Sequence, residues 1–179
     1  FSDFRMSNIK EDHEYEGVRV NFYAWLKKTR IPMQLDISTG DKITPEALLS
    51  TFPQLIKMDS AELKTYPKET VFAEKFEAMV KLGLTTSRMK DIYDLYILID
   101  FFGKILNKET LLKAIKVTFD HRGTAVPGPP VKIFTEYLYD DQNKQKQWAA
   151  FINKTLEKDL SLKATVEAIA KFINPLLCR

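Results

Sequence analysis

The sequence has few of the residues that build covalent or metal-based frameworks. Its 179 residues include one cysteine, Cys178, and two histidines, neither of which has a further histidine or cysteine at ligand spacing. This excludes an internal disulfide and gives no support for a zinc site. A lone cysteine is typical of a protein from the reducing cytosol, so we expect a cytoplasmic location. The chain also contains no Gly-x-x-x-x-Gly-Lys phosphate loop and no Gly-x-Ser-x-Gly nucleophile turn.

Long apolar runs and a strong excess of one charge are also missing. The most apolar stretch, residues 92–106, is interrupted by three charged side chains, so it is too short and too polar to span a bilayer and is expected to be a buried helix. The 27 basic and 24 acidic residues leave a net charge of +3, which is too small to predict nucleic-acid binding from bulk electrostatics. A nucleic-acid contact would have to use local lysines on the later helices, although lysines at this density usually mark a solvated face. The candidates are Lys144, Lys146 and Lys154.

Two segments near the N-terminus show the alternation of apolar and polar residues that is typical of half-buried strands. The first covers residues 18–26 and the second residues 33–38, and residues 27–31 between them form a polar connection of hairpin length. Later in the chain the apolar residues recur at helical spacing up to the C-terminus. The sequence therefore predicts an α+β fold, with a β-rich domain of residues 1–66 and a helical domain of residues 67–179.

Boundary signals divide the second half of the chain into several helices. Pro67 suits a first helical turn, Gly83 a helix end and Asn107 a helix start. Residues 124–130, with three prolines and a glycine, are the best candidate for a linker. Helices are expected at about 67–81, 87–102, 107–122, 131–139, 141–154 and 162–177.

The expected helix at 67–81 contains one residue that breaks its pattern. A step of about 100° per residue places Glu74, Glu77 and Lys81 opposite a broad apolar face, but Lys75 falls inside that face. A buried ammonium without a partner is costly, so Lys75 either reaches the solvent or meets concentrated negative charge, such as a carboxylate or a phosphate. If carboxylates meet it, its removal should destabilise folding. If only a bound phosphate does, its removal should leave the free protein unaffected.

The next expected helix begins with a dense group of charges. Arg88 precedes Asp91 by three residues and Lys90 precedes Asp94 by four. Both carboxylates fall on one helix face near the positive end of the helix dipole. Local ion pairs that favour helix initiation explain this arrangement as well as a functional site does, and the spacing leaves both open. Residues 95–99 in the same helix are apolar all round, and we expect them to be buried.

Asp36 is a third candidate because it lies on the polar face of the second expected strand, whose other face is apolar. A carboxylate in this setting can project into a cleft and bind a divalent cation, since Mg²⁺ prefers hard oxygen ligands. Acidic residues on the surface of strands are common, however, so this aspartate alone is a weak indication of a metal site.

Several segments in the same order resemble the AbiEii/AbiGii nucleotidyltransferase toxin family of bacterial type IV abortive-infection toxin–antitoxin pairs. They include Glu74-Lys75-Phe76-Glu77-Ala78 and the motif Arg88-x-Lys90-Asp91-x-x-Asp94. The resemblance implies a partial DNA-polymerase-β-like nucleotidyltransferase core with antiparallel or mixed strands, followed by a C-terminal helical bundle. The matching segments extend over nearly the whole chain and comprise residues 15–20, 33–41, 66–78, 87–95 and 118–124.

The same resemblance assigns roles to the residues that break the patterns. It implies that Lys75 and Arg88 bind the substrate phosphates, that Asp91 or Asp94 is the essential acid, and that Asp36 is a metal-binding carboxylate. We expect these side chains to converge on one cleft. The implied reaction is Mg²⁺-dependent transfer of a nucleotide from a nucleoside triphosphate to an acceptor, for which tRNA is a candidate, in abortive infection and phage defence. The implied protein partner is a cognate antitoxin encoded nearby.

One part of the family pattern is missing. The first motif, Gly-Ser or Gly-Gly followed by Asp-x-Asp, does not occur, and the nearest N-terminal acid, Asp3, has no glycine pair before it. Without those carboxylates a two-metal site is incomplete, so we expect a fragment that is inactive alone and binds Mg²⁺ weakly at best. The alternative is a non-catalytic helical interaction module, in which Lys75, Asp91 and Asp94 only form a buried ion-pair network.

Overall fold

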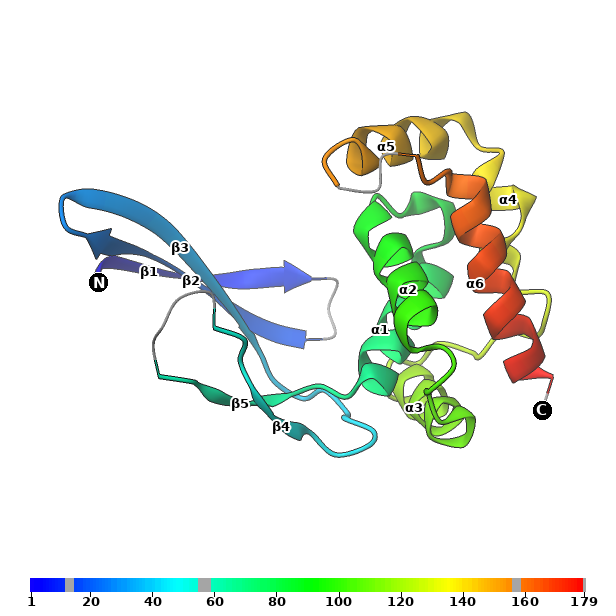
Figure 1. The fold of residues 1–179 in the computed structure, drawn as a ribbon, viewed down its shortest axis with the longest axis horizontal. Coiled ribbons are helices and arrows are strands. Elements are labelled where there is room, and N and C mark those ends of the chain that lie inside the picture. Colours follow the sequence, from blue (N-terminus) through cyan, green and yellow to red (C-terminus); the bar gives the residue numbers. More distant parts are fainter. Residues whose placement is uncertain (12–14, 55–58, 156–158, 179) are drawn as a thin grey trace. The chain divides into compact units, whose positions relative to one another are not determined.

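The computed structural model describes residues 1–11, 15–54, 59–155 and 159–178. It contains small antiparallel sheets followed by helices, which confirms the α+β class. The chain forms two compact units, Phe1–Lys42 and Ile43–Arg179 (Figure 1). The boundary expected at residue 66 lies just before α1 (Lys68–Leu82), where the helical part begins. The division into two domains at that residue stays a prediction.

The first unit is a three-stranded antiparallel sheet of β1 (Ser2–Glu11), β2 (Tyr15–Leu26) and β3 (Thr29–Ser38), in that order. The two expected strands are β2 and β3, but their connection is shorter than the pattern indicated. Leu26 pairs with Thr29, so the turn has only two residues, and Lys27 adopts a positive φ of 54° within it. The sequence does not predict β1, because its apolar residues alternate over only a few positions.

Much of this sheet is exposed. Val20 on the central strand is buried, whereas Met33 and Leu35 on β3 are 42% and 52% exposed. The expectation of half-buried strands is therefore wrong for β3, which is exposed along its whole length. The physical reason is that the described part of this unit contains no helix or second sheet that could cover the apolar face.

The second unit begins with a short hairpin of β4 (Leu48–Thr51) and β5 (Glu62–Thr65) and is helical from there on. Its α-helices are α1 (Lys68–Leu82), α2 (Met89–Phe102), α3 (Lys108–His121), α4 (Glu136–Tyr139), α5 (Gln142–Ile152) and α6 (Leu162–Leu177). The short 3-10 turns η1 (Gly83–Thr85) and η2 (Lys132–Phe134) connect them. α2 packs against both α1 and α6, and α3 packs against α1 (Figure 1). No helix in the described ranges is long and apolar enough to cross a membrane.

The expected helices are confirmed within a few residues, with three corrections. Residues 131–139 do not form one helix, because Thr135 is extended and its side chain caps a new helix, α4. The apolar half of α2 is not buried all round, since Leu95 is buried but residues 96–99 are only half-buried. Residues 124–130 connect α3 to η2 inside the second unit, so they are not a linker between compact units.

The apolar face of α1 anchors this helix in the core of the second unit. Phe72, Phe76 and Met79 are fully buried. The ring of Phe76 lies 5.1 Å from that of Phe119 on α3 and 6.0 Å from that of Phe134 in η2, measured between centroids. Burial of each such side chain contributes about 1.5–3 kcal/mol. The packing of these rings therefore sets the direction in which the polar side chains of α1 point.

Glu77 contradicts the helical pattern, which placed it on the outer face of α1. It is only 1% exposed, and its two oxygens accept hydrogen bonds from Arg122 Nη1 at 3.0 Å and Thr124 Oγ1 at 2.5 Å. Arg122 is the residue that ends α3, and Gly123 follows with a positive φ of 61°, so the chain turns there and brings Thr124 to α1. The pattern could not show this, because the two partners lie 45 and 47 residues away in the sequence.

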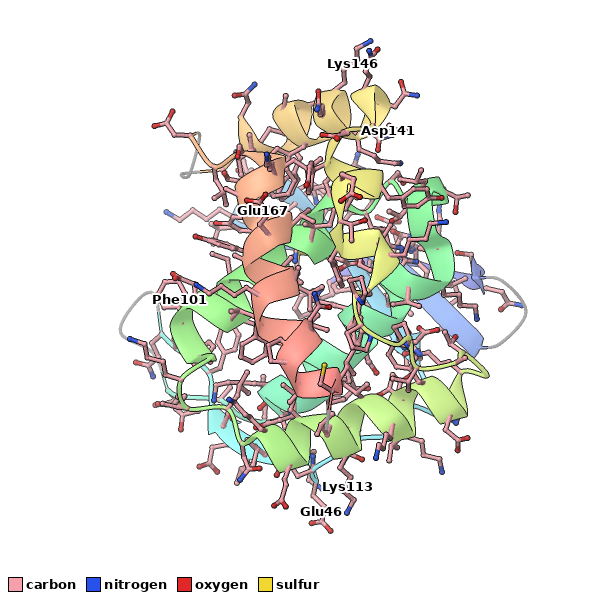
Figure 2. The ribbon with its side chains drawn as sticks, turned by 90° about the vertical axis from the view of Figure 1, so that its right-hand side faces the viewer. Glu46, Phe101, Lys113, Asp141, Lys146 and Glu167 are labelled. Atoms are coloured by element: carbon pink, nitrogen blue, oxygen red, sulfur yellow. The ribbon has the colours of Figure 1, made fainter. Side chains whose placement is uncertain are left out.

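Arg122→Ala should destabilise the chain by about 3–5 kcal/mol, because it leaves the buried Glu77 carboxylate without its cation. Urea denaturation followed by circular dichroism measures the difference. Lys113→Ala is the matched control, since Lys113 is an exposed residue of the same helix and projects into solvent (Figure 2). The double variant Arg122→Ala/Glu77→Leu should recover most of the loss. A double variant as unstable as Arg122→Ala alone would contradict the assignment.

Candidate functional site

The ammonium of Lys75 on α1 lies between two carboxylates of α2. Its Nζ is 2.8 Å from Asp91 Oδ1 and 2.7 Å from Asp94 Oδ2. The three side chains are 21%, 15% and 23% exposed, so the cluster is mostly buried but accessible to solvent. Of the two alternatives that the helical pattern left open for Lys75, the structure shows negative charge beside it, and protein carboxylates provide that charge.

Two further cations flank the carboxylates. Lys90 Nζ lies 2.5 Å from Asp94 Oδ2, and Arg88 Nη1 lies 4.0 Å from Asp91 Oδ2. The spacing in the sequence predicts both pairs, and both cations are more than half exposed. Three cations against two carboxylates leave these five side chains with one net positive charge. Such a group suits an anionic ligand.

The carboxylates owe their position to the start of α2. They stand three residues apart and so project from one face of the helix, near the positive end of its dipole. Arg88, the residue before the helix, provides no side-chain cap. Instead its backbone N–H donates to Thr86 Oγ1 at 3.0 Å, and the N–H of Asp91 donates to the carbonyl of Arg88 at 3.0 Å. The placement of both acids therefore depends on the short segment between α1 and α2.

The ion pairs favour the charged forms of their partners. Burial by itself would lower the pKa of Lys75, but the hydrogen bonds to Asp91 and Asp94 outweigh it, and the pKa lies above its ordinary value. Burial would likewise raise the pKa of Asp94, but the hydrogen bonds donated by Lys75 and Lys90 hold it below its ordinary value. Lys75 is thus a cation throughout the physiological range, and its chemistry is electrostatic.

Asp36 belongs to the other compact unit and takes part in a separate ion pair. Arg19 lies directly opposite on β2 and donates to both carboxylate oxygens, at 2.7 and 2.8 Å. Gln34 Nε2 also donates to this carboxylate. The hydrogen bonds from Arg19 are the main reason that the pKa of Asp36 lies below its ordinary value. The structure thus brings Lys75 together with the acids of α2, and the convergence of Asp36 on the same cleft stays a prediction.

The described residues do not by themselves form a magnesium site. In the described ranges, no three or more His, Cys, Asp or Glu side chains come together in a way that could hold a metal ion. Both oxygens of Asp36 accept hydrogen bonds from the Arg19 guanidinium, which would have to move before the carboxylate could bind Mg²⁺. The site in hand is therefore a lysine–aspartate cluster.

Lys144 differs from the sequence-based expectation, which grouped it with surface lysines. It is 5% exposed, and its Nζ donates to the backbone carbonyl of Thr86 at 2.5 Å and to Gln147 Oε1 at 3.1 Å. Lys146 and Lys154 are exposed, as expected. Helical spacing does distinguish Lys144 from them, because it stands four and eight residues before Trp148 and Ile152 on the buried face of α5. Its carbonyl partner lies 58 residues away, so the pattern could not identify that partner.

The cluster is thus a partly exposed lysine held by two acids and flanked by two more exposed cations, in a chain of the α+β class. The family model described as "Nucleotidyl transferase AbiEii toxin, Type IV TA system" matches residues 1–171. The chain belongs to this family of nucleotidyltransferase toxins, which act in type IV toxin–antitoxin systems with a cognate antitoxin. No curated protein and no solved structure matches the chain. The family resemblance read from the sequence is confirmed.

Asp94→Asn should lower the free energy of unfolding by about 1.5–3 kcal/mol near neutral pH, the range for a hydrogen bond to a charged group. Since the folded pKa of Asp94 lies below its unfolded value, the contribution is present above about pH 4 and is lost as the pH falls through the folded pKa. Since the folded pKa of Lys75 lies above its unfolded value, the contribution is complete below about pH 10.4 and is lost as the pH rises through the folded pKa.

Urea denaturation of wild type and Asp94→Asn across this pH range measures the difference between them. It should be constant between about pH 5 and about pH 10 and shrink at both ends. Asp100→Asn is the matched control, because Asp100 is an exposed residue of the same helix. A wild-type advantage that persists undiminished at the acidic end would show that the ion pair contributes no stability.

Proposed function

We propose that the helical unit provides the phosphate-contacting part of a nucleotidyltransferase, which transfers a nucleotide from a nucleoside triphosphate to an acceptor. In this reaction an acceptor hydroxyl oxygen attacks the α-phosphorus, the bond to the bridging oxygen of the β-phosphate breaks, and pyrophosphate leaves. Negative charge develops on the transferred and leaving groups, so cations at fixed positions lower the barrier. tRNA is the candidate acceptor, and abortive infection in phage defence is the proposed setting.

The geometry at Lys75 is the observation that supports this proposal. An ammonium has three N–H donors, and Asp91 and Asp94 engage two of them. The side chain remains 21% exposed, so the third donor can reach a phosphate oxygen from the solvent side. The two carboxylates order the long side chain before the substrate arrives, which reduces the entropy lost on binding.

The neighbouring side chains have complementary roles in this proposal. Arg88 is half-exposed, and its planar guanidinium can bind a second phosphate through two parallel hydrogen bonds. The ion pairs to Lys75 use Asp91 Oδ1 and Asp94 Oδ2. The second oxygen of Asp94, or that of Asp91 once Arg88 moves to a phosphate, can accept the proton of the acceptor hydroxyl. We therefore keep both acids as candidates for the essential carboxylate.

We include Mg²⁺ in the proposal only because the resemblance to the family implies it. When bound, Mg²⁺ would neutralise phosphate charge, and Asp36 would provide one of its oxygen ligands after release from Arg19. The other ligands would come from the Asp-x-Asp motif, which this sequence lacks. We therefore propose that catalysis requires a polypeptide that also carries that motif and that the present chain alone is inactive.

The rival hypothesis is that the cluster is only a structural ion-pair network in a helical interaction module. Both hypotheses predict that Lys75→Met lowers stability, because two mostly buried carboxylates lose their common cation. They differ for the double variant Lys75→Met/Asp91→Asn. This variant removes one uncompensated charge and leaves Asp94 paired with Lys90, so it should recover much of the stability.

In a complete toxin that carries the Asp-x-Asp motif, both Lys75→Met and the double variant should lose transfer activity by about 100-fold or more. The reason is that loss of one charge-neutralising phosphate contact costs on the order of 3 kcal/mol in the transition state. Incorporation from each labelled nucleoside triphosphate into total RNA with Mg²⁺ measures the activity, and thermal melts of the same proteins measure stability.

Lys116→Met, which changes an exposed lysine of α3, should behave like wild type in both assays. If the double variant regains transfer activity together with stability, the role of Lys75 is structural and the catalytic proposal fails. If stability returns and transfer does not, the rival hypothesis fails.

A further inference from the structure

Lys144 is a buried cation whose contacts are with neutral groups. It lies in the first turn of α5, and its ammonium donates to the carbonyl of Thr86 and the side-chain oxygen of Gln147. No carboxylate in the described part of the chain forms an ion pair with it. A buried ammonium with only neutral acceptors is unfavourable compared with an apolar side chain of the same length, so its presence requires an explanation.

Thr86 is the residue through which Lys144 reaches the start of α2. It is 2% exposed, its N–H donates to the carbonyl of Gly83 at 3.3 Å, and its Oγ1 accepts from the N–H of Arg88. With Lys144 on the carbonyl, every polar group of Thr86 is engaged. Arg88 provides no side-chain cap, but its own N–H is held by the hydroxyl of Thr86, and Lys144 holds the carbonyl of the same threonine.

α5 contacts α2 at a second point, Tyr93, in the helical turn that also carries Asp91 and Asp94. The ring of Phe151 lies 5.7 Å from the ring of Tyr93 in an edge-on arrangement. Tyr93 stands between Asp91 and Asp94 in the sequence. α5 thus contacts both Thr86, in the segment before α2, and the turn of α2 that carries the acids. The aromatic contact supplies packing, whereas the hydrogen bond to a carbonyl also fixes a direction.

We propose that Lys144 is a positioning residue for the site: by holding the carbonyl of Thr86, it fixes the first turn of α2 and directs Asp91 and Asp94 toward Lys75. A long stem with a terminal donor is the feature that selects lysine here, since methionine has a similar length and no donor. The consequence for catalysis rests on the proposed function, but the positioning itself can be measured on this chain alone.

Amide hydrogen exchange of Lys144→Met, followed by NMR, tests the positioning. The amides of Arg88 and Asp91 should exchange about tenfold faster or more than in wild type, while those in the core of α3 and α6 change far less. Lys146→Met is the matched control from the same helix, where Lys146 projects away into solvent (Figure 2), and it should leave all rates unchanged. If all protected amides accelerate by a common factor, Lys144 only stabilises the fold and the proposal is wrong.

Two further variants keep the test decisive. Thr86→Val removes the hydroxyl arm of the same junction and should accelerate the same amides, whereas Thr86→Ser retains it and should not. Because both hydrogen bonds are made by the same residue, Thr86, Lys144→Met and Thr86→Val should combine to less than the product of their separate effects. If Lys144→Met does not fold, Lys144→Gln is judged by the same comparison of local and core amides. Independent, multiplicative effects would overturn the proposal.

Activity separates this inference from the proposed function. In the complete toxin, Lys144→Met should lower kcat by about tenfold, because the displaced acids neither accept the proton nor hold Lys75 in place. Faster local exchange with unchanged transfer would support the positioning role and contradict the proposed catalytic role of the carboxylates. Unchanged local exchange would contradict the positioning role whatever the activity.

Discussion

The ammonium of Lys75 lies on the core-facing side of α1, so it needs negative charge beside it. This need restricts where α2 begins and how it is oriented. Lys75 directly precedes the fully buried Phe76, so the packing that anchors α1 also carries the ammonium toward α2. Asp91 and Asp94 meet it only if α2 starts at one place and in one orientation. The start of α2 is in turn held by the hydrogen bonds of Thr86, one to the N–H of Arg88 and one to Lys144 of α5.

α1 contributes to two ion-pair clusters, one around Glu77 and one around Lys75, and the two differ in their exposure to solvent. The carboxylate of Glu77 is buried, and its two oxygens accept hydrogen bonds from Arg122 and Thr124 within the protein. The ammonium of Lys75 is more accessible and retains a donor beyond its two carboxylates. Both clusters restrict the rotation of α1 about its axis, since a buried charge tolerates few alternative positions. The second is the one to which we assign the phosphate contact in the proposed function.

The chain belongs to a family of nucleotidyltransferase toxins, and the residues to which the family resemblance gives roles lie in two different compact units. The groups suited to phosphate, Lys75 and Arg88, lie in the helical unit together with two acids. The carboxylate expected to bind metal, Asp36, lies in the sheet unit and is neutralised by Arg19. The proposed phosphate contacts and the proposed metal ligand therefore come from different compact units of the chain.

The sequence by itself determined the features that depend on near neighbours along the chain. Apolar periodicity predicted most helices and exposed Lys75 as an anomaly, and the i,i+3 and i,i+4 spacings predicted the pairs of Arg88 with Asp91 and Lys90 with Asp94, because one turn of helix fixes those geometries. Tertiary structure alone decided that Glu77 is buried and which backbone carbonyl the ammonium of Lys144 meets. Their partners lie 45 to 58 residues away, and a helical pattern shows which way a side chain points but not which distant groups will meet it there.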